Sequence, residues 1–272
     1  MNFFTLLAWV CPLLLCSIGA LYSEYAGRLA LFMEALISFS GFLTYTFTIY
    51  TSSVIAGTLL SLFFSVLVIF IASLLVELLK ANPFIAALAL NLLLGALTSL
   101  LSAKLWGSRG VLTSPEFQFS VTKVKLFSVI ISIFTIGLGL IFLRFTKAGL
   151  YLRISGSDPE VLRAKGVKTL TYRILSWLLA ALFSSLAGSF LVLRISSFVP
   201  NISSGRGWMA LAAVYLGKKK AWKISLSIFI FCLADILSTN IQNYIPQIPS
   251  AILLSLPYFI MLLLIVFDNK NE

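Results

Sequence analysis

The residues that could do chemistry in this sequence are few and stand far apart. There is no histidine, so the commonest general base and metal ligand is absent. The three cysteines, Cys11, Cys16 and Cys232, lie inside apolar segments and lack a C-x-x-C spacing. Gly217-Lys218-Lys219 is the nearest approach to a phosphate-binding loop and does not match its pattern. The sequence therefore predicts no catalytic residue, no metal ligands and no cofactor bound by this chain.

Acidic residues inside apolar sequence are the next candidates. A carboxylate at the centre of a membrane helix costs roughly 2.5–3.5 kcal/mol on insertion scales, so it must face water or a partner. Asp235 lies in the middle of an apolar run, and Glu34 lies near the start of another. Two roles stay open for Asp235: lining a solute pathway, or hydrogen bonding between helices. Glu77 is expected near an inner helix end, with Lys80 as its candidate partner.

Breaks in the apolar sequence give a further set of candidates. Irregular backbone at membrane depth is tolerated where it lines a cavity, although each break can also be a plain loop. Polar residues within the runs can form a seam between helices. The resulting pathway candidates are Asn82, Pro83, Asn91, Asn201, Gly205 and Asp235. Arg206, close to the predicted outer face, is the candidate contact for a protein that docks from outside.

The composition predicts the type of structural element that positions these residues. The 272 residues are 60% hydrophobic and 11% charged, whereas a soluble domain would be about half apolar and a quarter charged. The chain is therefore predicted to be an all-α, polytopic membrane protein of about 8 to 10 spans, forming a single domain over residues 1–272. Apolar runs place the spans at about 3–22, 30–50, 54–78, 84–103, 124–143, 174–193, 221–241 and 250–267.

The distribution of lysine and arginine predicts the orientation. The net charge of +11 would suggest nucleic acid in a soluble protein, but here the cations gather in short loops. With residues 144–173 on the cytoplasmic side, inner segments hold 14 basic residues and outer segments 6. This count needs a crossing through Ser203–Gly217, because Gly207–Gly217 alone is only about 16 Å long. The N-terminus is then outside and the C-terminus inside.

The polar segment 144–173 has the pattern of an ordered docking element. Ser155–Pro159 is predicted to form a turn, with Asp158 as the N-cap of a short helix and Pro159 at its first position. Glu160 suits the first turn, and Gly166 can end the helix. The helix is expected to lie parallel to the membrane. It could dock a partner, or rest on lipid head groups.

Six blocks of sequence, in order from about residue 19 to residue 267, carry a family resemblance. They are LYSEYAG at 21–27 with Glu34, ANPFI at 81–85 with LALNL at 88–92, TKAGL at 146–150 with Arg153, GSDP at 156–159 with AKGV at 164–167, FVPN at 198–201 with GRGWMALA at 205–212, and PY at 257–258. Together they resemble the permease of bacterial ABC importers for ribose-type sugars, nucleosides and branched-chain amino acids. The chain is most similar to the smaller permease of the nucleoside-type systems.

This resemblance implies a set of partners. An ABC ATPase subunit, which carries ATP and Mg, would hold the coupling helix in a groove. A second permease would complete a heterodimer, and an extracytoplasmic substrate-binding lipoprotein would deliver a nucleoside, or else a pentose or hexose. The setting would be the bacterial cytoplasmic (inner) membrane, with lipid around the chain and no nucleic acid. The implied coupling residues are Gly156, Asp158, Pro159, Glu160, Arg163, Ala164 and Gly166.

Two stretches of the sequence depart from the family pattern. Gly27-Arg28-Leu29-Ala30 replaces a "Gvvnigl" run, and Lys218-Lys219-Lys220 replaces a "g.w.P" turn and adds charge at the cytoplasmic face.

Two other functions stay open. A stand-alone secondary transporter would use Asp235 or Glu34 to carry a coupling ion. An intramembrane enzyme would need a nucleophile–base pair, and none is visible in the sequence.

Overall fold

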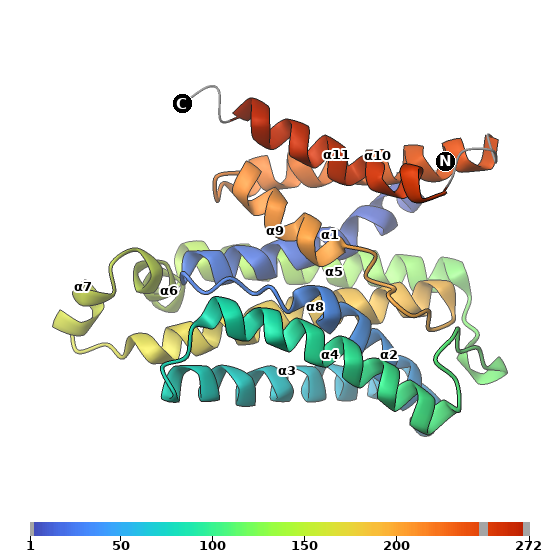
Figure 1. The fold of residues 1–272 in the computed structure, drawn as a ribbon, viewed down its shortest axis with the longest axis horizontal. Coiled ribbons are helices and arrows are strands. Elements are labelled where there is room, and N and C mark those ends of the chain that lie inside the picture. Colours follow the sequence, from blue (N-terminus) through green and yellow to red (C-terminus); the bar gives the residue numbers. More distant parts are fainter. Residues whose placement is uncertain (1–2, 245–249, 269–272) are drawn as a thin grey trace.

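The computed structural model describes residues 3–244 and 250–268, and these residues are almost entirely helical. The elements are α1 (Phe3–Tyr25), α2 (Met33–Thr51), α3 (Val54–Leu78), α4 (Pro83–Trp106), the short η1 (Pro115–Phe117), α5 (Val121–Phe145), α6 (Lys147–Ser157), α7 (Pro159–Ala164), α8 (Thr169–Ile195), α9 (Arg206–Leu216), α10 (Ala221–Tyr244) and α11 (Ser250–Asp268). The long helices lie side by side along the longest axis, and α6 and α7 project at one end (Figure 1). The predicted all-α membrane fold is confirmed. Residues 269–272 of the predicted inner C-terminus lie outside the described part.

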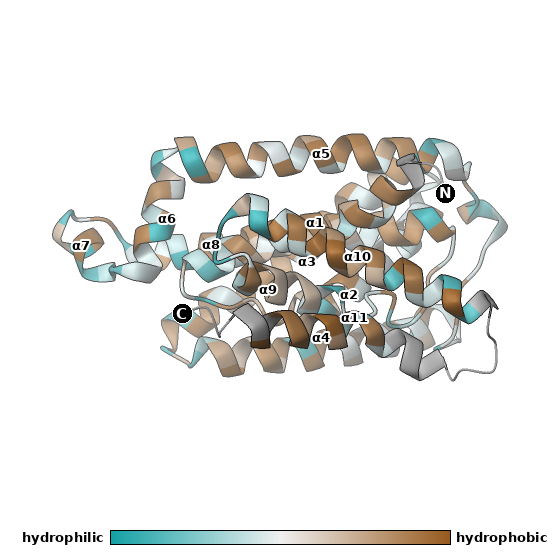
Figure 2. Cartoon of the chain, turned by 90° about the horizontal axis from the view of Figure 1, so that it is seen from above, coloured by the Kyte–Doolittle hydropathy of each residue, from teal (hydrophilic) through white to brown (hydrophobic). Residues whose placement is uncertain are grey.

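Six helices of the described part are long and apolar enough to cross a membrane. They are Leu6–Tyr25, Val54–Leu78, Pro83–Trp106, Thr122–Phe145, Thr169–Ile195 and Ala221–Gln242. Two more predicted spans, 30–50 and 250–267, form α2 and α11 but fall outside this set. The α2 helix carries many hydroxyl side chains, and α11 contributes only the shorter apolar stretch Ser255–Leu264. Figure 2 shows the polar residues gathered on α6, α7 and the connecting loops.

The centre of the bundle is built from α1, α2 and α8. Most of α2 is buried, and α8 packs along it as well as along α1. A Cβ on Gly188 of α8 would collide with the Ile37 carbonyl oxygen, so this glycine allows the two backbones to approach closely. The hydroxyls of Thr44 and Ser189 lie 2.7 Å apart across the same interface. By contrast, α3, α4 and α5 present large apolar side chains outward, as lipid-facing helices do.

Two irregular segments run through the interior of the bundle. Residues 26–32 join α1 to α2, with Ala30 and Phe32 inaccessible to solvent. Residues 196–205 join α8 to α9, with Phe198 and Ser203 buried. Non-helical backbone is tolerated at membrane depth only where protein surrounds it or a cavity adjoins it. The α9 helix that follows has 11 residues, about 16 Å, and is too short to cross a membrane alone.

The predicted docking element forms α7. The Asp158 carboxylate accepts hydrogen bonds from the Glu160 and Val161 backbone N–H groups at 3.2 and 3.3 Å, which confirms the N-cap. Gly166, with φ of +71°, follows the last turn and ends the helix as predicted. The predicted Ser155–Pro159 turn is wrong in extent, because α6 continues to Ser157 and only Asp158 interrupts the helices.

Candidate functional site

A cavity of about 460 Å³ lies between α2, α4 and the irregular segment 196–205. Hydroxyl, amide and small side chains dominate its wall. The lining residues are Glu34, Ala35, Ser38, Asn91, Leu92, Gly95, Ala96, Thr98, Ser99, Ser102, Arg109, Phe198, Pro200, Asn201 and Ser203. The structure thus brings two predicted pathway residues, Asn91 and Asn201, into one wall.

The cavity wall extends to the middle part of α4. Asn91 lies about 12 Å along α4 from Pro83, and about 22 Å from Trp106 at the other end, at 1.5 Å per residue. Its side-chain oxygen accepts a hydrogen bond from the Ala35 backbone N–H at 2.9 Å. This bond satisfies a donor in the first turn of α2 and fixes α4 against α2 at the cavity.

Glu34 joins the start of α2 to the start of α9. Its Oε1 accepts a hydrogen bond from the Gly205 N–H at 2.7 Å, and its Oε2 accepts one from the Gly207 N–H at 2.8 Å. The first N–H groups of a helix lack partners within the helix and carry partial positive charge, so a carboxylate is stabilised there. Both carboxylate oxygens therefore have backbone partners. No partner for Glu34 could be predicted from the sequence, although an acid in apolar sequence and the Gly-Arg-Gly break were two signals of this contact.

The two glycines of this junction are required by geometry. Gly205 has φ of +78°, which L-residues rarely adopt, and a Cβ there would collide with the Tyr258 side chain. A Cβ on Gly207 would lie 2.6 Å from the Glu34 backbone nitrogen. The chain can therefore enter α9 beside α2 only with small residues at these positions. Gly205, another pathway candidate, adjoins the cavity wall without being part of its lining.

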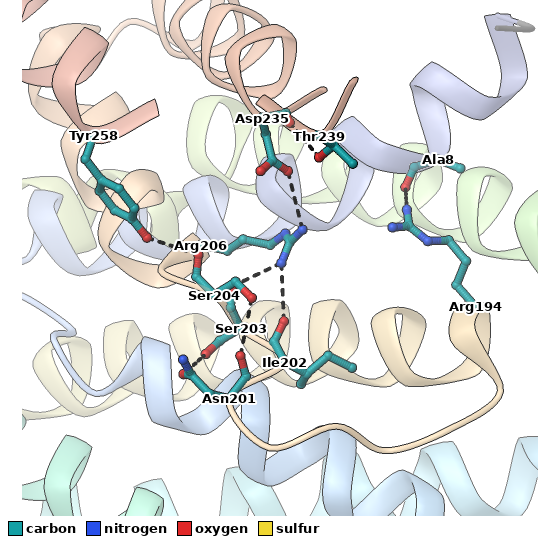
Figure 3. Close-up of polar contacts among 10 residues, drawn as sticks. All are labelled: Ala8, Arg194, Asn201, Ile202, Ser203, Ser204, Arg206, Asp235, Thr239 and Tyr258. Atoms are coloured by element: carbon teal, nitrogen blue, oxygen red, sulfur yellow. Dashed lines mark hydrogen bonds and ion pairs between the residues drawn. The ribbon is translucent and has the colours of Figure 1, made fainter. Parts of the chain in front are cut away.

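Arg206 and Asp235 form an ion pair between α9 and α10 (Figure 3). The Arg206 Nη2 lies 3.7 Å from Asp235 Oδ2, and the two side chains are 13% and 27% exposed. The Arg206 Nη1 also donates to the carbonyl oxygens of Ile202 and Ser203, both at 3.2 Å. Asp235 thus has a structural partner and does not line the cavity. The docking role of Arg206 stays a prediction, and its inward position gives the residue a structural role.

Hydroxyl contacts hold the segment 196–205 from two further sides. The Ser38 hydroxyl of α2 donates to the Ser203 hydroxyl at 3.0 Å. The Tyr258 hydroxyl of α11 donates to the Ser204 carbonyl at 3.0 Å, as Figure 3 shows. Sequence reasoning missed Ser38 and Ser203, because single serines in apolar runs are common and carry no spacing signal.

Two other candidates lie at the N-terminal end of α4, away from the cavity lining. The Asn82 side chain accepts a hydrogen bond from the Phe84 N–H at 3.0 Å, and Pro83 is the first residue of the helix. Their geometry is that of a helix cap. A pathway role for Asn82 and Pro83 stays a prediction.

The Glu77–Lys80 pairing expected from the sequence is wrong. Glu77 pairs instead with Arg28 at 2.7 Å and with Arg173 at 3.9 Å. Burial lowers the pKa of the Arg28 guanidinium, and the Glu77 carboxylate opposes that shift. The partners were missed because both arginines are far from Glu77 in sequence and meet it only in the folded chain.

The predicted coupling residues gather on the projecting end of the molecule. Glu160, Arg163, Ala164 and Gly166 are exposed on or beside α7, whereas Leu162 is buried beneath it. The neighbouring apolar side chain of Val161 is 41% exposed. This combination of charged and apolar groups on a rigid, capped helix is a surface that could enter a groove of a partner.

Comparison with known proteins identifies relatives along nearly the whole chain. Residues 2–267 match the family model described as "Branched-chain amino acid transport system / permease component". The nucleoside ABC transporter permease NupC of Lactococcus lactis is 26% identical, with 97% of this chain and 91% of NupC covered. The guanosine ABC transporter permease NupQ of Bacillus subtilis is 25% identical, with 94% and 88% covered. TsgC13 of Haloferax volcanii, named as a glucose ABC transporter permease, is 25% identical, with 85% and 74% covered.

One solved structure has a similar fold. PsaBC from Streptococcus pneumoniae, in complex with Fab, has a TM-score of 0.53 and 14% identity, with 97% of this chain and 91% of that chain covered. At this identity the likeness concerns the fold alone.

Proposed function

The chain belongs to the family of branched-chain amino acid transport system permease components, and from this premise we propose that it carries a nucleoside across the membrane. It is a multi-pass ABC permease subunit of the inner membrane and is not itself an enzyme. Permeases of this family work with ATPase partners, which use ATP and Mg, and with substrate-binding partners. The proposal concerns the solute and the arrangement of these partners.

The lining of the cavity is the observation that supports a nucleoside. Hydroxyl and amide groups suit a solute rich in hydroxyls, and the carboxylate of Glu34 is already occupied by two backbone N–H groups. Arg109 adds one cationic group to the lining. Phe198 adds an aromatic ring to the wall. The nucleoside permeases NupC and NupQ align with more of this chain than the glucose-named TsgC13 does. A monosaccharide is the second candidate, because hydroxyl and amide groups suit it equally.

The arrangement we propose pairs this chain with a second, related permease. The exposed α7 enters a groove of the ATPase subunit, through Asp158, Pro159, Glu160, Arg163 and Ala164. A substrate-binding lipoprotein delivers the solute from outside. Closure of the ATPase subunits on ATP then moves the α6–α7 end, and the cavity opens alternately to the two sides of the membrane.

The charge pairing argues against a stand-alone ion-coupled transporter. Such a protein needs a carboxylate that can release its partner and bind an ion or proton. In the described residues, Glu34 is bound to two N–H groups and Asp235 is paired with Arg206. No group of three or more potential metal ligands occurs within residues 3–244 and 250–268.

Uptake by the reconstituted system tests the proposal. The chain would be expressed with the ATPase, permease and binding protein encoded beside it, in cells that lack nucleoside and sugar uptake. Labelled uridine, guanosine, ribose and glucose would be supplied in parallel. We expect nucleoside uptake that an inactive ATPase variant abolishes. Uptake of glucose or ribose alone would favour the monosaccharide function, and uptake unaffected by the ATPase variant would refute an ATP-driven importer.

A further inference from the structure

We propose that α9 is a strut linking the coupling end to the cavity, and that Glu24 is the positioning residue holding its inner end. The inference rests on the proposed function, because it assigns a mechanical role within an ATP-driven permease. It concerns contacts that neither the family pattern nor the relatives assign.

The inner end of α9 is held by a cluster of Glu24, Tyr25, Tyr215 and Lys219, which we name the inner clasp. The Lys219 Nζ lies 3.2 Å from Glu24 Oε1, and the Tyr215 hydroxyl donates to Glu24 Oε2 at 3.2 Å. The Tyr25 hydroxyl donates to the Lys219 carbonyl at 3.0 Å. Both oxygens of Glu24, at the end of α1, thus hold the end of α9 and the turn that follows it.

The other end of α9 is held in the same manner at the cavity. There the two oxygens of Glu34 bind the N–H groups of Gly205 and Gly207. An 11-residue helix is about 16 Å long, and hydrogen bonds within it resist bending. Because a carboxylate fixes each end, a displacement at the inner clasp is carried to the cavity wall.

The inner clasp also adjoins the coupling end. A Cβ on Gly156 of α6 would collide with the Tyr25 carbonyl oxygen, so α6 packs directly on the end of α1. Gly27, with φ of +65°, belongs to the same segment and also lies against Gly156. Only Asp158 separates α6 from α7. Movement of α7 by a bound ATPase would therefore displace the residue next to Glu24.

The turn after α9 is a strained segment. Lys218 and Lys219 have φ of +46° and +61°, which non-glycine residues seldom adopt. Such conformations persist where surrounding contacts fix them, and the bonds of Lys219 to Glu24 and Tyr25 do so. The charge of Lys219 therefore serves a contact within the chain.

Charge exchange across the inner clasp tests the inference. Glu24→Lys, Lys219→Glu and the double exchange would be compared with wild type in the purified complex, reconstituted in liposomes. ATP hydrolysis and uptake of labelled uridine would be measured together. We expect each single change to lower uptake per ATP hydrolysed by at least fivefold, and the double exchange to restore at least half. Lys220→Glu is the matched control, because it makes the same charge change in the same turn outside the clasp.

A second readout needs no transported solute. Ser99→Cys would place a thiol on the cavity wall, and its rate of labelling by a maleimide would be compared between nucleotide-free and vanadate-trapped complexes. We expect a nucleotide-dependent difference that each single exchange abolishes and the double exchange restores. Single variants that keep the difference, or a double exchange without rescue, would overturn the strut. In the wild-type complex, absence of uridine uptake together with an intact labelling difference would refute only the solute assignment.

Discussion

The two carboxylate oxygens of Glu34 each accept a backbone N–H group at the start of α9. A carboxylate that accepts backbone N–H groups from a second helix satisfies donors that no intrahelical carbonyl can reach. It also keeps a negative charge at the positive end of α9, which stabilises the charge without a cationic side chain. The consequence is an acid at depth that is structural and still adjoins a solute cavity.

Glu34→Gln should destabilise the protein. A glutamine offers one acceptor and turns an NH₂ donor toward a backbone donor, so one N–H loses its partner, at a cost of about 1–3 kcal/mol. Thermal unfolding of the detergent-purified chain should show a lower midpoint than wild type. Glu116→Gln, an exposed acid outside the bundle, is the control and should leave the midpoint unchanged. Equal midpoints for both variants would contradict the role given to Glu34.

Arg206 and Asp235 should differ in what their removal costs. Arg206→Ala loses the ion pair and the two carbonyl contacts, whereas Asp235→Asn leaves the carbonyl contacts in place. Because Asp235 is partly exposed, its pairing is screened and worth about 1 kcal/mol or less. We therefore expect a larger fall in unfolding midpoint for Arg206→Ala. We also expect ATP-driven uptake to persist in Asp235→Asn. If wild-type uptake depended on a proton gradient and Asp235→Asn abolished it, the ion-coupled function would be favoured instead.

At the scale of elements, the close approach of α9 to α2 depends on one missing side chain. Gly207→Ala would drive a Cβ into the Glu34 backbone, which cannot yield as a flexible side chain could. Overpacking of this kind typically costs about 1–3 kcal/mol. We expect less folded protein in membranes and loss of uptake, measured by detergent-extracted yield and by transport.

Gly95→Ala is the matched control for that change. A Cβ at Gly95 meets nothing within 4 Å, although the residue lies in α4 and lines the cavity. Alanine also favours a helix by up to about 1 kcal/mol relative to glycine. The yield should match or exceed wild type. A defect as large as that of Gly207→Ala would show that any added methyl near the cavity is harmful.

The exposed α7 helix should be dispensable for folding and required for partner binding. Glu160→Lys with Arg163→Glu reverses two charges on this helix, and both residues are solvent-exposed. The affinity-purified chain should be recovered at near-wild-type yield without the co-expressed ATPase subunit. Glu116→Lys makes an acid-to-lysine change in the loop between α4 and α5 and should retain the ATPase. Retention by the double variant would contradict the coupling role.

At the scale of the whole molecule, six of the long helices divide into a buried set and a lipid-facing set. The buried helices α1, α2 and α8 carry glycine and hydroxyl contacts, and the outer α3, α4 and α5 present apolar side chains. The cavity lies where α2 and the segment 196–205 meet α4. This division explains why α2 is too polar to qualify as a span by composition, although it forms a long helix at the centre.

The sequence by itself determined the membrane class, most helix positions, the N-cap at Asp158 and the family. These properties depend on composition, on runs of apolar residues and on local hydrogen bonds within four residues, so they can be read along the chain. Only the tertiary structure decided that Glu34 binds Gly205 and Gly207, that Glu77 pairs with Arg28, and that Asn91 and Asn201 share a wall. The Glu34–Gly205 bond joins residues 171 positions apart. No local pattern encodes such a pairing, because it depends on how already formed helices pack together.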